Sequence, residues 1–66
     1  MNAKEILIYL IEILLFYLEE LSEVVIDHPF TYGEKTAFVE CLEIIQHWSE
    51  AKVHGLDFDI EEIYPI

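Results

Sequence analysis

Residues 6–18 read Ile-Leu-Ile-Tyr-Leu-Ile-Glu-Ile-Leu-Leu-Phe-Tyr-Leu, and this run decides the fold because only Glu12 among its thirteen positions is charged. The run falls short of the roughly 20 apolar residues that a membrane span needs. Glu19 and Glu20 close it with negative charge, only Lys4 precedes it, and no small-residue cleavage site follows. We therefore expect a buried helix rather than a membrane span or a secretion signal, in a cytoplasmic protein.

Asn2 and Glu5 mark the start of this helix, since Asn is a preferred N-cap and an acidic residue three positions later resembles a capping box. The pattern predicts a helix over residues 3–26. Apolar side chains form a seam on one side of it and also line both flanks of the seam. Because a helix that is apolar almost all round must be buried on more than one side, one partner helix is not enough. The expected seam consists of Leu7, Leu10, Leu14, Leu18, Leu21 and Val25.

A second helix is predicted over residues 32–54, after a connection that contains Pro29. Thr31 and Glu34 give a T-x-x-E capping box, and Gly55 suits the left-handed conformation that ends a helix. Residues 56–66 alternate apolar and acidic positions and can form one more short turn. The expected apolar face of the second helix consists of Ala37, Cys41, Ile44, Ile45, Trp48 and Ala51.

The predicted fold is all-α: one helical-hairpin domain over residues 1–66, with two long antiparallel helices and a short C-terminal turn or helix. The second helix covers only about a third to half of the first, given the width of an apolar stripe. A homodimer in which two hairpins form a four-helix bundle would bury the rest, with the tails packed across the outside. The alternative is a monomer whose tail folds back over the exposed flank.

The charge of the chain limits the kinds of partner it can bind, and its cysteine content limits the disulfides it can form. The 66 residues carry fourteen Asp and Glu against three Lys and Arg, a formal net charge of -11. Binding to a phosphate backbone depends on Lys and Arg, so direct nucleic-acid binding is not expected. An acidic balance suits solubility, a basic protein partner, or an inhibitor that mimics nucleic acid. Cys41 is the only cysteine, which excludes a disulfide within the monomer, and its place on the apolar face predicts a buried structural thiol.

One constellation on the second helix resembles a metal site. Glu43, His47, Glu50 and His54 follow one another at spacings of four, three and four, which places possible ligands of a divalent metal on one side of a helix. The same spacing is ordinary for a solvated helix face, so both interpretations stand. The two glycines lie outside any phosphate-binding motif, and no nucleophile has a base nearby. The sequence therefore predicts no enzyme and implies no cofactor.

Residues 30–37 (FTYGEKTA), 40–46 (ECLEIIQ) and 55–59 (GLDFD) resemble segments of short uncharacterised proteins of Gram-positive bacteria and their mobile elements. The similarity covers residues 30–66 and leaves the first helix unspecific. The resemblance implies a small bacterial cytoplasmic protein of accessory type. It brings no activity and no functional residues.

The leading functional hypothesis is a small acidic interaction module that docks on another protein through residual apolar surface and its acidic tail. The alternatives are a divalent-metal-binding protein and the nucleic-acid mimic described above. If the tail is a binding segment, its apolar residues are the expected contacts; otherwise they pack on their own chain. These partner-binding candidates are Leu56, Phe58, Ile60, Ile63 and Tyr64.

Overall fold

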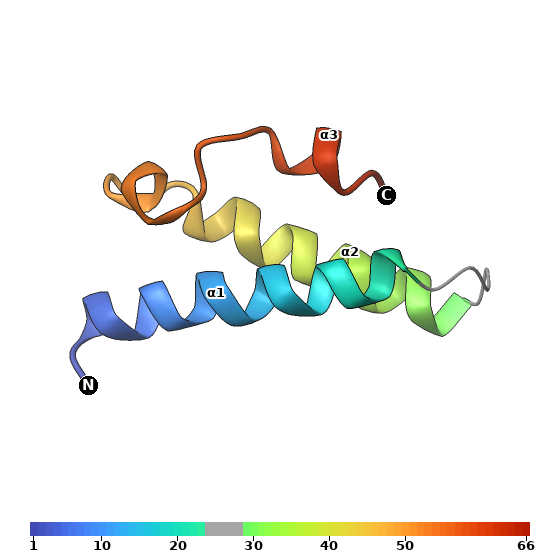
Figure 1. Cartoon of the computed structure of the whole chain (residues 1–66), viewed down its shortest axis with the longest axis horizontal. Helices are drawn as coiled ribbons and strands as arrows, with labels where there is room; N and C mark the ends of the chain where they lie inside the picture. Colours follow the sequence, from blue (N-terminus) through green and yellow to red (C-terminus); the bar gives the residue numbers. More distant parts are fainter. Residues whose placement is uncertain (24–28) are drawn as a thin grey trace.

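The computed structural model describes residues 1–23 and 29–66, and every regular element in that part of the chain is a helix. Two long helices, α1 (Ala3–Ser22) and α2 (Pro29–Ile45), run antiparallel to each other (Figure 1). A 3₁₀ helix η1 (Ala51–His54) and a short helix α3 (Ile60–Ile63) follow. This arrangement confirms the predicted all-α hairpin with a C-terminal turn. Residues 24–28, which include the predicted end of the first helix, lie outside the described residues.

The start of α1 is the one predicted. Asn2 is the N-cap, and its side-chain oxygen accepts a 2.8 Å hydrogen bond from the backbone N–H of Glu5. This bond satisfies one of the N–H groups that the first turn of a helix leaves without an internal partner. Among the helices of the described part, none is long and apolar enough to cross a membrane.

The bounds of α2 differ from the prediction at both ends. The helix begins at Pro29, so Thr31 lies inside the first turn instead of capping it. Proline is favoured at the first helical position, because its fixed φ suits a helix and its missing N–H is not needed there. The helix ends at Ile45, nine residues before the predicted end at 54.

Beyond Ile45 the backbone tightens into turns. The N–H of His47 donates to the carbonyl of Ile44 at 3.1 Å and that of Trp48 to the carbonyl of Ile45 at 2.9 Å, both three residues back. The Gln46 side chain holds the returning tail, since its Nε2 donates to the carbonyl oxygens of Leu56 at 3.2 Å and Phe58 at 2.8 Å. The chain therefore turns back along the hairpin where the sequence pattern predicted a continuing helix.

Gly55 completes this reversal. Its φ of 107° lies in the left-handed region, as predicted, and the N–H of Leu56 donates to the carbonyl of Ala51 at 3.0 Å. Left-handed backbone is open to glycine at little steric cost, because glycine has no Cβ. The tail then runs back beside α2 to α3 (Figure 1), and the predicted short turn after Asp59 is confirmed.

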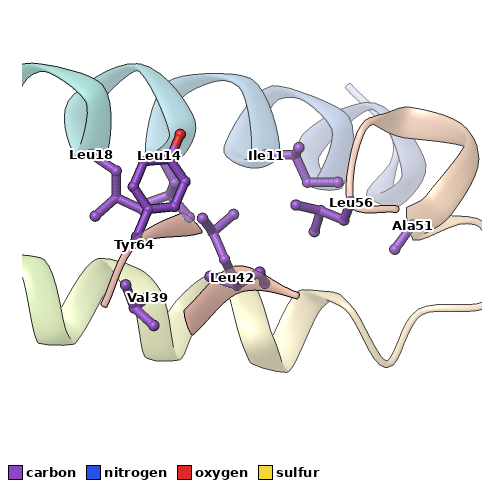
Figure 2. Close-up of a cluster of buried hydrophobic side chains, with 9 residues drawn as sticks. Ile11, Leu14, Leu18, Val39, Leu42, Ala51, Leu56 and Tyr64 are labelled. Atoms are coloured by element: carbon purple, nitrogen blue, oxygen red, sulfur yellow. The ribbon is translucent and has the colours of Figure 1, made fainter. Parts of the chain in front are cut away.

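The core joins α1, α2 and the tail. Leu14 and Leu18 of the predicted seam are buried, together with Ile11. On α2 the buried residues are Val39 and Leu42, so the predicted apolar face is wrong for α2: its Ala37, Cys41 and Ile44 are exposed, and only Ile45 packs against the core. Figure 2 shows the Tyr64 ring from the tail beside Leu14 of α1, with Val39 and Leu42 on the α2 side of it. The buried set is Ile11, Leu14, Leu18, Val39, Leu42, Ala51, Leu56, Ile60 and Tyr64.

The molecule is more elongated than its length requires. Its radius of gyration is 12.2 Å, with principal extents of 37 × 24 × 16 Å, whereas a compact chain of this length has about 11 Å. An elongated pair of helices exposes more side surface than a sphere. The tail lies along one flank of the hairpin, where Leu15 and Glu19 line a pocket together with Phe58 and Tyr64, and the opposite flank carries no part of the tail.

We expect Ile60→Ala to lower the free energy of unfolding by about 2 to 5 kcal/mol, because Ile60 is only 1% exposed in the core and its removal leaves a cavity. Ile63→Ala is the matched control, since Ile63 is 57% exposed three residues away and should change stability by at most about 0.5 kcal/mol. Urea denaturation measures both. If Ile60→Ala does not fold, Ile60→Val should still cost about 0.5 to 1.5 kcal/mol. Equal effects at the two positions would contradict a tail that belongs to the core.

Candidate functional site

An open groove runs along the uncovered flank of the hairpin, between α1 and α2. It has two parts, a pocket of about 490 Å³ toward the hairpin connection and a pocket of about 280 Å³ toward the N-terminus of α1 and the end of α2. Both are lined from both helices. The first is lined by Tyr17, Glu20, Leu21, Glu34 and Phe38, and the second by Leu10, Leu14, Cys41, Ile44 and Ile45. We call these ten residues the groove.

Helical spacing places the two pockets on the same side of the hairpin. On α1 the groove residues 10, 14, 17 and 21 follow at intervals of four, three and four, and on α2 residues 34, 38, 41 and 45 repeat these intervals. Residues at such intervals lie on one face of a helix. Because the helices are antiparallel, residues 10 and 14 lie opposite 41 and 45, while 17 and 21 lie opposite 34 and 38. The two pockets therefore lie in line along the same side of both helices.

The part near the end of α2 is apolar and exposed. Ile44 is 71% exposed and Leu10 is 40% exposed, although both are large aliphatic side chains. Cys41 is exposed beside them, so the predicted burial of this thiol is wrong. The reason is the orientation of α2, which places Val39 and Leu42 in the core and leaves Cys41 and Ile44 outside.

The part near the connection combines aromatic and acidic groups. The rings of Tyr17 and Phe38 are stacked across the two helices, with centroids 5.7 Å apart and planes inclined by 29°. Glu20 from α1 and Glu34 from α2 line the same pocket. Two carboxylates beside aromatic rings form an environment that favours a cation.

The sequence-based prediction missed the groove because it placed Leu10, Cys41 and Ile44 in the core. The signal was present in the sequence, since α2 has apolar residues on two faces, one with Val39 and Leu42 and one with Cys41 and Ile44. Helical periodicity alone does not say which of two apolar faces turns inward.

The four metal-ligand candidates are not brought together. Only Glu43 lies on α2, because the helix ends before the other three residues. His47 is exposed in a turn, Glu50 pairs with Lys4 at 3.1 Å, and His54 stacks on Trp48 with ring centroids 5.4 Å apart. Within residues 1–23 and 29–66, no three His, Cys, Asp or Glu side chains lie close enough to hold a metal. The predicted stripe required an unbroken helix to residue 54.

The tail candidates divide between core and surface. Leu56, Ile60 and Tyr64 are buried in their own chain, Phe58 is half-buried, and Ile63 is exposed. Burial raises the pKa of the Tyr64 phenol, and the nearby Glu19 carboxylate adds to this effect. Three of the five residues proposed for partner binding therefore stabilise the fold, which is the alternative of intramolecular packing.

A group of carboxylates gathers where α3 meets α2. The pKa of Glu43 is raised above its ordinary value of 4.5, first by partial desolvation and then by Glu61, whose carboxylate repels it and shares a hydrogen bond with it. Glu40 and Asp59 contribute further repulsion. The contact between tail and α2 is thus weakened when all of these groups are charged.

Comparison with known proteins adds no family to this description: no family model, curated protein or solved structure matches the chain. The resemblance to short Gram-positive proteins stays a prediction.

We expect the stability of the protein to fall as the pH rises from 4.5 toward neutrality. Glu43 has a raised pKa in the folded state, so in this window the folded chain binds more protons than the unfolded chain, and the free energy of unfolding decreases with pH. Glu43→Gln should therefore raise the melting temperature at neutral pH and reduce the pH dependence over this range. Glu12→Gln, at an exposed position on α1, is the charge-matched control. Equal melting curves for the two variants at neutral pH would contradict the carboxylate repulsion.

Proposed function

We propose that the chain is a protein–protein interaction module and that the groove is its binding surface. The observation that carries this proposal is the pair of open pockets in line along one side of the hairpin, formed by helical faces whose spacing matches on α1 and α2. Exposed apolar surface that is contiguous and rimmed by polar residues marks interaction sites more often than scattered apolar residues do.

The energetics favour association. Full burial of a large aliphatic or aromatic side chain contributes about 1.5 to 3 kcal/mol. Leu10, Tyr17 and Ile44 are each at least 40% exposed in the isolated chain, so an occupant of the groove gains from several of them at once. This gain has to exceed the loss of translational and side-chain freedom on binding, which a surface of several adjacent side chains can do.

The tail supports the proposal by its position. It covers the flank opposite the groove and places Leu56, Ile60 and Tyr64 in the core, so it makes the hairpin stable without occupying the groove. Two classes of occupant fit the proposal. One is a second copy of the chain, which would give the homodimeric four-helix bundle, and the other is a different protein.

Cross-linking through the single thiol tests this proposal directly. A thiol-specific photo-cross-linker on Cys41 should give a covalent adduct with a polypeptide of the cell of origin or with a second copy, because Cys41 lines the groove. Leu10→Glu should remove the adduct by placing a charge in the apolar part. Ile63→Glu, an exposed apolar-to-acidic change on the tail, should leave it unchanged.

The control for general stickiness is Val53→Cys in a Cys41→Ser background, because Val53 is 80% exposed and absent from the groove lining. Equal adducts from Cys41 and from this variant, or adducts that survive Leu10→Glu, would remove the proposal. Light scattering across a dilution series assigns the occupant, since a second copy doubles the mass of 7.8 kDa.

A further inference from the structure

We infer that the occupant of the groove is a basic amphipathic helix supplied by another protein. The inference rests on the proposed function and deepens it by naming the chemistry of the partner. Three features of the groove lead to it: its length, its charge at one end, and the absence of basic side chains from its own lining.

The dimensions of the groove suit a helix. On each wall the lining residues span twelve positions, from 10 to 21 on α1 and from 34 to 45 on α2, and the eleven steps between the ends correspond to about 17 Å or about three helical turns. A valley between two packed helices accepts the ridge of a third one, with side chains at i, i+3 or i+4, and i+7 filling successive pockets. The occupant thus has an apolar stripe about three turns long.

The acidic end sets the charge of the occupant. Glu20 and Glu34 approach the larger pocket from opposite walls, with the stacked rings of Tyr17 and Phe38 beside them. A Lys or Arg side chain of the occupant would meet both carboxylates and an aromatic face, which are complementary to a cation in charge and in shape. The pocket volume of about 490 Å³ leaves room for such a long side chain.

Charge also argues against a second copy as the occupant. None of the ten groove residues is basic, so two grooves packed on each other supply no counter-charge for Glu20 and Glu34. Lys4 already pairs with Glu50 at 3.1 Å at the far end of the hairpin. Each copy brings a formal charge of -11, and this repulsion opposes self-association while it attracts a basic partner.

The test uses a helical peptide of about fourteen residues, about four turns, with Leu at i, i+3, i+4, i+7 and i+11 positions, Lys at the others, and a fluorescent label. We expect the full-length protein to bind this peptide at physiological salt, measured by fluorescence anisotropy. A peptide with Glu in place of Lys, and a scrambled Leu/Lys peptide of the same composition, should each bind at least about ten-fold more weakly, because the first lacks the charge and the second the stripe.

Variants of the protein place the binding in the groove. Glu20→Gln with Glu34→Gln should weaken the Leu/Lys peptide about ten-fold, as two partly exposed charge contacts would. Glu12→Gln with Glu62→Gln removes the same charge from exposed positions outside the groove and should change the affinity at most about two-fold. Equal losses in both double variants would overturn the inference, since they would mean attraction to net charge alone.

Alkylation of Cys41 supplies a local readout that does not depend on charge. Bound Leu/Lys peptide should slow the reaction of this exposed groove thiol with iodoacetamide, and should not slow that of Val53→Cys in the Cys41→Ser background. Unchanged alkylation of Cys41 under saturating peptide would show that the peptide binds elsewhere and would overturn the inference.

The inference and the proposed function fail differently. A groove-dependent dimer that Leu10→Glu dissociates, without groove-dependent peptide binding, would overturn the basic partner and keep the interaction module. Neither a groove-dependent adduct nor groove-dependent peptide binding would remove both.

Discussion

The structure depends on the excess of apolar surface around α1. Residues 6–18 hold only one charged side chain, and a single neighbouring helix covers about a third to half of such a helix. Two elements cover α1. Helix α2 packs on Leu14 and Leu18, and the tail adds Tyr64 to the same buried cluster. Even then Leu10 and Tyr17 stay 40% exposed. The groove is therefore one part of the apolar surface of α1 that stays uncovered; Ile6, Tyr9 and Phe16 are also exposed and lie outside it.

The tail also determines which face of α2 points inward. Both α1 and the tail pack on Val39 and Leu42. Turning these two side chains inward therefore makes both contacts at once. The Gln46 amide, one residue beyond the end of α2 at Ile45, supports this choice, because it donates to the carbonyl oxygens of Leu56 and Phe58 and holds the tail on this side. Cys41 and Ile44 are the second apolar face of α2, and they face the groove as a consequence.

Local chemistry made some features predictable from the sequence and left others open. The Asn2 cap, the turn at Gly55 and the short helix before Pro65 depend on a few neighbouring residues, and all three are as predicted. The end of α2 goes with two hydrogen bonds from Gln46, to Leu56 ten positions away and to Phe58 twelve positions away. A local sequence pattern does not report such contacts. The metal stripe was wrong for this reason, because its spacing assumed a helix through His54. The groove was missed because periodicity does not rank two apolar faces of one helix.

The acidity of the chain connects its solubility to its choice of partner. No charged side chain is buried in the described part, so the carboxylates there act at the surface. A groove that exposes Leu10 and Ile44 invites non-specific association, and a surface of one charge sign opposes it by repulsion between copies. This repulsion acts between two acidic copies, and it is absent for an occupant that carries positive charge. Glu20 and Glu34 at the edge of the groove discriminate between occupants by direct contact. An apolar helix without a cation would strip water from these two carboxylates and supply no ion pair in return. Under the proposed function, these two carboxylates favour a basic occupant over a second acidic copy.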